Sequence, residues 1–160
     1  MNYAGRVQAT TFETSSSEQT EAIGAALAGA LEPGDLVLVE GELGAGKTTF
    51  VRGACRALGV AERITSPTFV IGRTYRGRVP VSHVDLYRLD ALAGEDPALL
   101  ADYLTPDAVG FVEWPQRAEG AVDLEEVVAR VRIEHAGAER RRIEVAGTKL
   151  TIDALEQAVL

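Results

Sequence analysis

Residues 41–48 read GELGAGKT, a glycine-rich run that ends in a lysine and a threonine. They match the phosphate-loop pattern G-x-x-x-x-G-K-[ST] at every fixed position. Such a loop follows a strand and opens a helix, because the amides at the helix N-terminus must point at the phosphate. The chain meets both conditions, since residues 36–39 (LVLV) are a short apolar run and residues 48–58 predict a helix with one apolar face. The chain is therefore constrained to an α/β fold built around a strand–loop–helix unit.

The residue types in this loop explain the expected chemistry. Glycines allow the backbone to wrap a phosphate and to adopt positive φ. The ammonium group of Lys47 reaches the terminal phosphates, and the hydroxyl of Thr48 is a ligand for Mg²⁺. Lysine is rare in this chain, with only two of the sixteen basic residues. From the frequencies of glycine, lysine and serine plus threonine in the chain, the expected number of accidental matches to the pattern is on the order of 0.002. The expected nucleotide-binding residues are Gly41, Glu42, Leu43, Gly44, Ala45, Gly46, Lys47, Thr48 and Thr49.

A phosphate loop indicates a nucleotide without saying which one. A guanine-binding signature has the form Asn/Thr-Lys-x-Asp, and Thr148-Lys149 begins such a segment. Thr151 stands where the aspartate is needed. This difference favours ATP over GTP.

The rest of the chain alternates helical and strand patterns, which predicts a mixed, largely parallel sheet flanked by helices in one domain over residues 1–160. Ser15 and Glu18 have the spacing of a capping box at the start of a helix. Two hairpins are expected, around residues 76–78 and around residues 136–138. The C-terminal residues 153–160 fit either a helix packed on the edge or a frayed tail. The remaining expected elements are strands at residues 69–75, 79–85, 109–113, 127–135 and 140–145, and a helix at residues 95–104.

Charge and composition exclude several classes of protein. The formal net charge of −8 argues against a free-standing nucleic-acid binder, which would show a basic face. No apolar run approaches the roughly 20 residues of a membrane span, and residues 1–11 lack the apolar stretch of a signal peptide. The single cysteine, Cys55, lies on the apolar stripe of the second helix and is expected in the core. A cytoplasmic protein without membrane contact is the expectation.

Two acids follow apolar strands directly, Asp85 after residues 79–84 and Glu113 after residues 109–112. In an open α/β sheet the ligand lies outside the carboxyl ends of the strands, so these acids are the candidates for holding a metal or orienting water. The alternative interpretation of each acid is a solvated carboxylate at a strand end, without a function. His83 shares a strand face with Asp85, and packing is favoured over catalysis for it. Trp114, which follows Glu113, is either a core or surface ring or part of the nucleotide site or a partner contact.

Two further segments allow two interpretations each. Residues 65–69 (TSPTF) are either a plain turn into a strand or a loop that senses the γ-phosphate. The charged run at residues 139–142 (ERRR) is favoured as a solvated strand edge over a docking patch.

Taken together, five segments resemble the TsaE family (formerly YjeE), the bacterial P-loop ATPases of tRNA threonylcarbamoyladenosine (t6A) biosynthesis. The order and gaps of the segments and the length of the chain fit that family, over about residues 15–145. The phosphate loop alone fits many proteins, whereas the combination of the last three segments is specific to this one. The segments are residues 41–49 (GELGAGKTT), 52–53 (RG), 66–69 (SPTF), 83–89 (HVDLYRL) and 112–115 (VEWP).

The resemblance implies an ATPase that uses ATP and Mg²⁺. Thr48 and Glu113 would be the metal ligands, and Asp85 matches the catalytic acid of the family, so Asp85 and Glu113 are the expected catalytic residues. Residues 14–17, at the start of the first helix, would also hold the nucleotide. The family acts with TsaB and TsaD, and TsaD carries the transfer chemistry. ATP hydrolysis would allow that complex to turn over, and tRNA would be reached only through the complex.

Two other functions compete with this one. A small-molecule kinase also has a phosphate loop in a short α/β domain, and Arg73, Arg76 and Arg78 would then form a lid over the phosphates. A nucleotide-gated assembly module would bind a partner when ATP is bound and would need no hydrolysis.

Overall fold

The computed structural model describes residues 7–66, 71–87, 98–114, 116 and 124–160. Its strands are β1 (Val7–Thr14), β2 (Leu36–Gly41), β3 (Gly72–Arg76), β4 (Pro80–Asp85), β5 (Val109–Glu113), β6 (Val127–His135) and β7 (Arg141–Thr148). Its helices are α1 (Ser17–Ala28), α2 (Lys47–Ala57), the four-residue α3 (Ala98–Ala101) and α4 (Lys149–Val159), and a single 3-10 turn (Leu124–Glu126) precedes β6. The expected α/β fold is confirmed.

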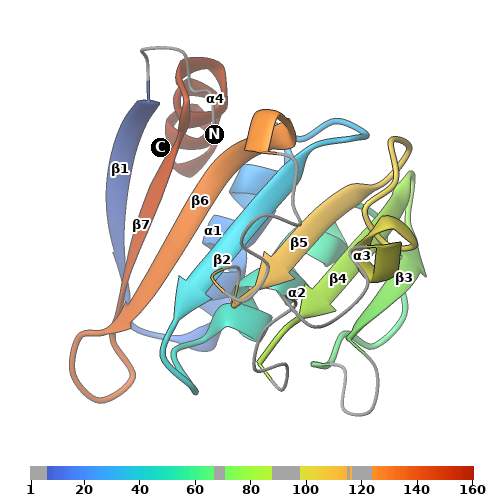
Figure 1. Cartoon of the computed structure of the whole chain (residues 1–160). Helices are drawn as coiled ribbons and strands as arrows, with labels where there is room; N and C mark the ends of the chain where they lie inside the picture. Colours follow the sequence, from blue (N-terminus) through green and yellow to red (C-terminus); the bar gives the residue numbers. More distant parts are fainter. Residues whose placement is uncertain (1–6, 67–70, 88–97, 115, 117–123) are drawn as a thin grey trace.

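All seven described strands form one sheet in the order β1-β7-β6-β2-β5-β4-β3 (Figure 1). The centre is parallel, since β2 pairs in parallel with both β5 and β6, and β4 pairs in parallel with β5. Both edges are antiparallel, through β3–β4 on one side and β6–β7–β1 on the other. The sheet is therefore mixed, as expected, with parallel pairing confined to its centre. This arrangement brings the carboxyl ends of β2, β4 and β5 to the same edge.

Helices α1, α2 and α4 pack on one face of the sheet, and α3 lies on the other face (Figure 1). The larger cluster joins Leu27 of α1, Phe50 of α2 and Ile152 of α4 to the inward side chains of the strands. These strand side chains alternate along β6 and β7, where every second residue is buried. The smaller cluster, on the face of α3, contains Leu100 and Leu38. The shape of the molecule thus follows from the burial of two apolar layers around one sheet.

Glycines allow α1 and α2 to lie in close contact. A Cβ atom at Gly53 of α2 would stand 2.0 Å from the carbonyl oxygen of Glu21 in α1. A Cβ atom at Gly24 of α1 would stand 2.1 Å from the carbonyl oxygen of Phe50 in α2. Both distances are far below van der Waals contact, so neither position has room for a side chain.

One strand, β1, was not predicted from the sequence. It pairs with β7 along its whole length, from Val7 opposite Thr148 to Thr14 opposite Arg141. Most of its residues are exposed or half-buried, and Phe12 is the partly buried side chain that packs on the core. An edge strand that buries so little carries a weak apolar pattern, and this explains why periodicity missed it.

The ends of two helices differ from the prediction. The N-cap of α1 is Ser16, whose side chain accepts a hydrogen bond from the backbone nitrogen of Gln19 at 3.1 Å. The Oε1 atom of Gln19 accepts a hydrogen bond from the backbone nitrogen of Ser15, the residue before the cap, at 2.7 Å. The cap is therefore one position later than expected, and the return bond goes to the residue before the cap and not to the cap itself, as it would in a capping box. The C-terminal residues form the packed helix α4, which starts earlier than predicted because Thr148 caps it.

Most other expected elements agree with the structure within a few residues. The strand expected at 69–75 is β3, and the part of that range before residue 71 lies outside the described residues. The helix expected at 95–104 is represented by α3, and residues 95–97 lie outside the described residues as well. Cys55 is fully buried as expected, and burial raises the pKa of its thiol to about 12. No helix in the described ranges is long and apolar enough to span a bilayer.

The close packing of α1 against α2 leads to a stability prediction. Gly53→Ala should lower the free energy of unfolding by about 1 to 3 kcal/mol, because its methyl group would meet the backbone of α1. The control is Gly29→Ala, at the C-cap of α1, where φ is −63° and the nearest atom to a Cβ lies at 3.5 Å. That change should be neutral or slightly stabilising. Urea unfolding of both variants measures the difference, and equal stabilities would contradict the packing described here.

Candidate active site

The phosphate loop connects the carboxyl end of β2 to the start of α2. Gly46 is the N-cap of α2, and its φ of 108° lies in the left-handed region that favours glycine. Gly41 also has positive φ, and a Cβ atom there would stand 2.6 Å from the carbonyl oxygen of Ile133 in β6. Glycine is therefore required at the position where the chain leaves the sheet and at the position where it enters the helix. The resulting loop places the free amides of α2 at the sheet edge.

Lys47 is the first residue of α2, and its side chain is buried. Its Nζ donates to the carbonyl oxygens of Gly41 and Glu42, both at 2.8 Å. Burial lowers the pKa of Lys47, and the nearby carboxylates of Glu113 and Asp85 oppose that shift. The ammonium group thus lies inside the curve of the loop, where two carbonyl oxygens of the loop itself hold it.

Glu113 at the end of β5 lies against Thr48 at the start of α2. The Thr48 hydroxyl donates to Oε2 of Glu113 at 3.1 Å, and the Glu113 side chain is 2% exposed. On its other side Thr48 contacts the hydroxyl of Ser66 at 2.6 Å. The sequence separates Thr48 from Glu113 by 65 residues, and the parallel centre of the sheet brings them together. A hydroxyl and a buried carboxylate in contact form an oxygen donor pair of the kind that Mg²⁺ prefers.

His83 lies on the same face of β4 as Asp85 and is completely buried. Its Nε2 is hydrogen-bonded to Oε2 of Glu113. Its Nδ1 has no hydrogen-bond partner among the described residues. Among the described residues, the ring is therefore hydrogen-bonded through Nε2, to the carboxylate of Glu113.

Asp85 at the end of β4 is next to Glu113 in the register of the two parallel strands. Its Oδ1 accepts a hydrogen bond from the backbone nitrogen of Tyr87 at 3.0 Å. Burial raises the pKa of the Asp85 carboxyl, and repulsion from Glu113 raises it further, against the opposing effects of the Tyr87 hydrogen bond, His83 and Lys47. A carboxylate with a raised pKa accepts a proton more readily than an ordinary one.

Trp114 follows Glu113 with a φ of 58°, a backbone conformation that is uncommon for any residue other than glycine. Its ring centroid lies 5.1 Å from that of Tyr87, with a tilt of 43° between the planes. The Nζ of Lys47 lies 4.4 Å from the centroid of the Trp114 ring, which is the distance of a cation–π contact. Trp114 is thus part of the candidate site, as the second interpretation of this residue proposed.

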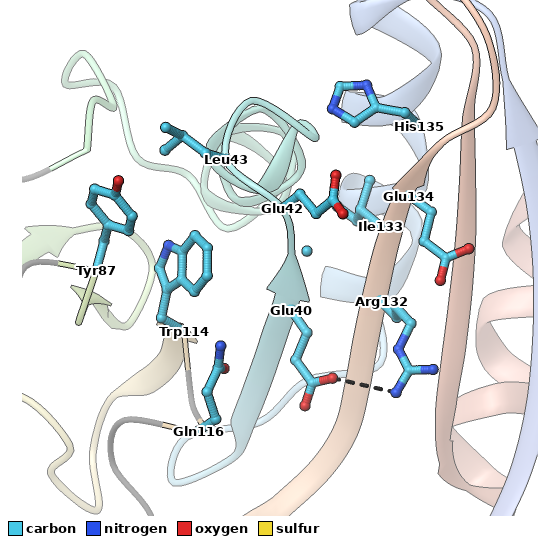
Figure 2. A pocket seen from close by; sticks show the side chains of 11 residues that line it. Glu40, Glu42, Leu43, Tyr87, Trp114, Gln116, Arg132, Ile133, Glu134 and His135 are labelled. Atoms are coloured by element: carbon cyan, nitrogen blue, oxygen red, sulfur yellow. Dashed lines mark ion pairs between the residues drawn. The ribbon is translucent and has the colours of Figure 1, made fainter. Parts of the chain in front are cut away.

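A cavity of about 810 Å³ borders the first half of the loop. Figure 2 shows Tyr87 and Trp114 on one side of it and Arg132 and Glu134 of β6 on the other. Glu42 and Leu43 of the loop complete the rim beside them. The described residues that line this cavity do not include Thr48 or Glu113.

One contact of the loop was missed by the sequence analysis. The Nε of Arg141, at the start of β7, donates to the carbonyl oxygen of Ala45 at 2.9 Å. The sequence favoured a solvated strand edge for this arginine run, and Arg142 fits that description because it is exposed beside Glu13. Arg141 instead braces the phosphate loop from the second hairpin. Only the pairing of distant strands reveals this, so no local signal was available.

The structure brings the predicted catalytic and metal-binding residues together with the loop. Ala45 and Lys47 are buried, Gly41, Gly46, Thr48 and Thr49 are half-buried, and Glu42, Leu43 and Gly44 are exposed. The start of α1 is also close, since the Cγ2 atom of Thr20 lies 4.0 Å from a Cβ atom built at Gly46. Ser66 reaches Thr48, whereas residues 67–69 of the same segment lie outside the described residues.

Two of the three arginines of the alternative kinase lid lie away from this edge of the sheet. Arg76 and Arg78 precede β4, whereas Asp85 ends it, so the strand separates them by roughly 16 Å. The side chain of Arg78 donates to the carbonyl oxygen of Ala57, at the end of α2. Arg73 is exposed on the edge strand β3, where it pairs with His83 near the carboxyl end of β4. Arg76 and Arg78 are therefore not placed to close over the phosphate loop in this structure.

Known proteins with the same organisation were then compared with the chain. A relative from Bacillus subtilis named tRNA threonylcarbamoyladenosine biosynthesis protein TsaE is 37% identical over 133 residues, which cover 82% of each chain. Relatives of the same name from Streptomyces coelicolor and Treponema pallidum are 46% identical over 71% of this chain and 34% identical over 82% of it. The alignments cover 78% and 96% of those two proteins.

The fold of this chain is also similar to that of a solved structure. The crystal structure of Bacillus subtilis YdiB superposes with a TM-score of 0.78 and is 30% identical, over 97% of this chain and 99% of that one. A family model described as threonylcarbamoyl adenosine biosynthesis protein TsaE matches residues 14–143. The chain therefore belongs to the TsaE family.

Proposed function

We propose that this protein binds ATP with Mg²⁺ and hydrolyses it to ADP and phosphate. The observation that carries the proposal is the contact between Thr48 of the phosphate loop and Glu113 at the end of β5, with Asp85 beside Glu113. Phosphoryl transfer requires little covalent chemistry from a protein, because positioning and charge stabilisation supply most of the catalysis. The cation of Lys47, the proposed metal ligands Thr48 and Glu113 and the proposed base Asp85 all lie at this one edge of the sheet.

The donor chemistry fits Mg²⁺. Thr48 and Glu113 offer a hydroxyl and a carboxylate oxygen, both hard ligands, and phosphate oxygens and water would complete the shell of the ion. No group of three or more His, Cys, Asp or Glu side chains among the described residues is arranged as a metal site on its own. This agrees with a metal that binds together with the nucleotide. When bound, Mg²⁺ would be held by Thr48 and Glu113 and would help to neutralise the charge that develops on the phosphates.

The roles of the other side chains follow from their positions. Lys47 would exchange its two carbonyl contacts for phosphate oxygens, and the amides at the start of α2 would bind the same anion. Asp85 would orient the attacking water and accept its proton, because its raised pKa increases its basicity. Arg141 would hold the loop in shape through the carbonyl oxygen of Ala45.

The process served by this hydrolysis is proposed from the family. Relatives that are 34% to 46% identical are named as proteins of tRNA threonylcarbamoyladenosine biosynthesis. We therefore assign the protein to t6A formation as the ATPase that acts with TsaB and TsaD and allows their complex to turn over. The net charge of −8 supports a division of labour in which the partners hold the tRNA.

The first prediction concerns binding. Lys47→Ala should abolish nucleotide binding, because it removes the cation at the centre of the loop. The matched control is Lys149→Ala, which changes the other lysine of the chain, an exposed residue paired with Asp153 in α4. Calorimetric titration with ATP measures both affinities. Binding by Lys47→Ala with the affinity of the control would refute the assignment of the loop.

The second prediction concerns hydrolysis. Asp85→Ala and Glu113→Ala should retain measurable nucleotide binding and lower kcat by at least about tenfold, since proton transfer and metal positioning contribute that much or more. Asp107→Ala, at the opposite end of β5, changes an exposed acid and should hydrolyse ATP like the unaltered protein. Phosphate release under saturating ATP provides the comparison.

This experiment also tests the assembly-module alternative. If Asp85→Ala releases no phosphate from ATP but still binds TsaB–TsaD in an ATP-dependent manner and supports repeated rounds of t6A formation, hydrolysis is dispensable and the proposed ATPase role is wrong.

A further inference from the structure

His83 is the buried polar residue of the site to which the proposed hydrolysis assigns no task. It lies on β4, two residues before Asp85, and it is 0% exposed. Its neighbours in the sheet register are Arg73 of β3 and Phe111 of β5. Because its side chain is fully buried, the ring does not reach water, and a direct catalytic task is unsuited to it.

The one hydrogen bond of the ring goes to the carboxylate that contacts Thr48. Ionised Glu113 can only accept hydrogen bonds, so the proton of this contact belongs to Nε2 of His83. The Thr48 hydroxyl donates to the same oxygen, Oε2, at 3.1 Å. Two donors from different elements thus hold one carboxylate oxygen, and this restricts rotation of the carboxylate about its own axis.

A purely space-filling histidine would be arranged differently. Burying a polar atom without a partner costs free energy, so core histidines normally satisfy both ring nitrogens. Nδ1 of His83 has no partner among the described residues. Among the described residues, the ring is thus held through Nε2, by the carboxylate of Glu113. An aliphatic residue would fill the same space without this bond.

We infer that His83 is a positioning residue, which holds Glu113 in the orientation that binds the Mg²⁺ of the bound nucleotide. The inference rests on the proposed function, since it assigns to His83 the geometry of the metal-binding carboxylate. The ligand involved is a divalent cation together with a nucleoside triphosphate. Groups that orient metal-binding residues in this way typically change metal affinity by 10- to 100-fold when they are removed.

Three substitutions separate positioning from packing. The amide nitrogen of a glutamine is three bonds from Cβ, as Nε2 of histidine is, so His83→Gln keeps a donor close to Glu113. His83→Asn is polar as well, but its amide nitrogen is one bond too short for this contact. His83→Leu fills the space and offers no donor. Thermal unfolding of each variant by circular dichroism establishes which of them are folded.

The readout is Mg²⁺-dependent nucleotide binding, which requires no turnover. Calorimetry with the non-hydrolysable β,γ-imido analogue of ATP gives the dissociation constant in excess EDTA and at a series of Mg²⁺ concentrations. We expect all folded variants to bind the analogue within about twofold of the unaltered protein in EDTA. Mg²⁺ should increase the affinity for the analogue, and His83→Asn and His83→Leu should need about tenfold more Mg²⁺ than the unaltered protein to reach half of this increase. His83→Gln should need less than about threefold more.

The possible results distinguish this inference from the proposed function. If folded His83→Asn and His83→Leu show the Mg²⁺ dependence of the unaltered protein, or if His83→Gln is as impaired as they are, His83 does not position Glu113. If none of the variants other than His83→Gln folds, the proposal stands or falls on the Mg²⁺ dependence of that variant, which must remain within threefold. If the unaltered protein itself fails to bind the analogue, the proposed function is wrong, independently of His83.

Discussion

The carboxylate of Glu113 is the point on which the site depends. It accepts hydrogen bonds from Thr48 of the phosphate loop and from His83 of the neighbouring strand, so it joins α2, β4 and β5 at one edge of the sheet. Because Glu113 is buried, the negative charge has to be balanced by donors rather than by water. The same need to balance a buried negative charge makes this edge of the sheet a candidate site for a cation. Asp85 is affected as well, since the charge of Glu113 contributes to raising its pKa.

The topology of the sheet explains why these groups meet. Parallel strands end at the same edge, and the centre of this sheet is parallel. The antiparallel edges have another task. On one side the β6–β7 hairpin carries Arg141, which braces the loop through Ala45, and on the other side β3 covers the strand of His83. The centre of the sheet thus places the reacting groups, and its edges support them.

Sequence reasoning predicted the parts of this site that have local signals. The loop pattern identified Lys47 and Thr48, and acids after apolar runs identified Asp85 and Glu113, because both signals need only neighbouring residues. The β1 strand was missed because an exposed edge carries little apolar periodicity. The task of Arg141 and the contact between His83 and Glu113 depend on strands far apart in the chain, so no spacing rule could reveal them. The cap of α1 lies at Ser16, one residue after the predicted Ser15, because three consecutive serines all offer a side chain that could cap the helix.

The proposed hydrolysis of ATP at this edge of the sheet is tested by the release of inorganic phosphate from ATP by the purified protein with Mg²⁺, alone and together with TsaB and TsaD. We expect phosphate release that requires Mg²⁺ and continues beyond one turnover in at least one of the two conditions. The absence of phosphate release in both conditions, or transfer of the phosphate to a metabolite instead of water, would contradict it.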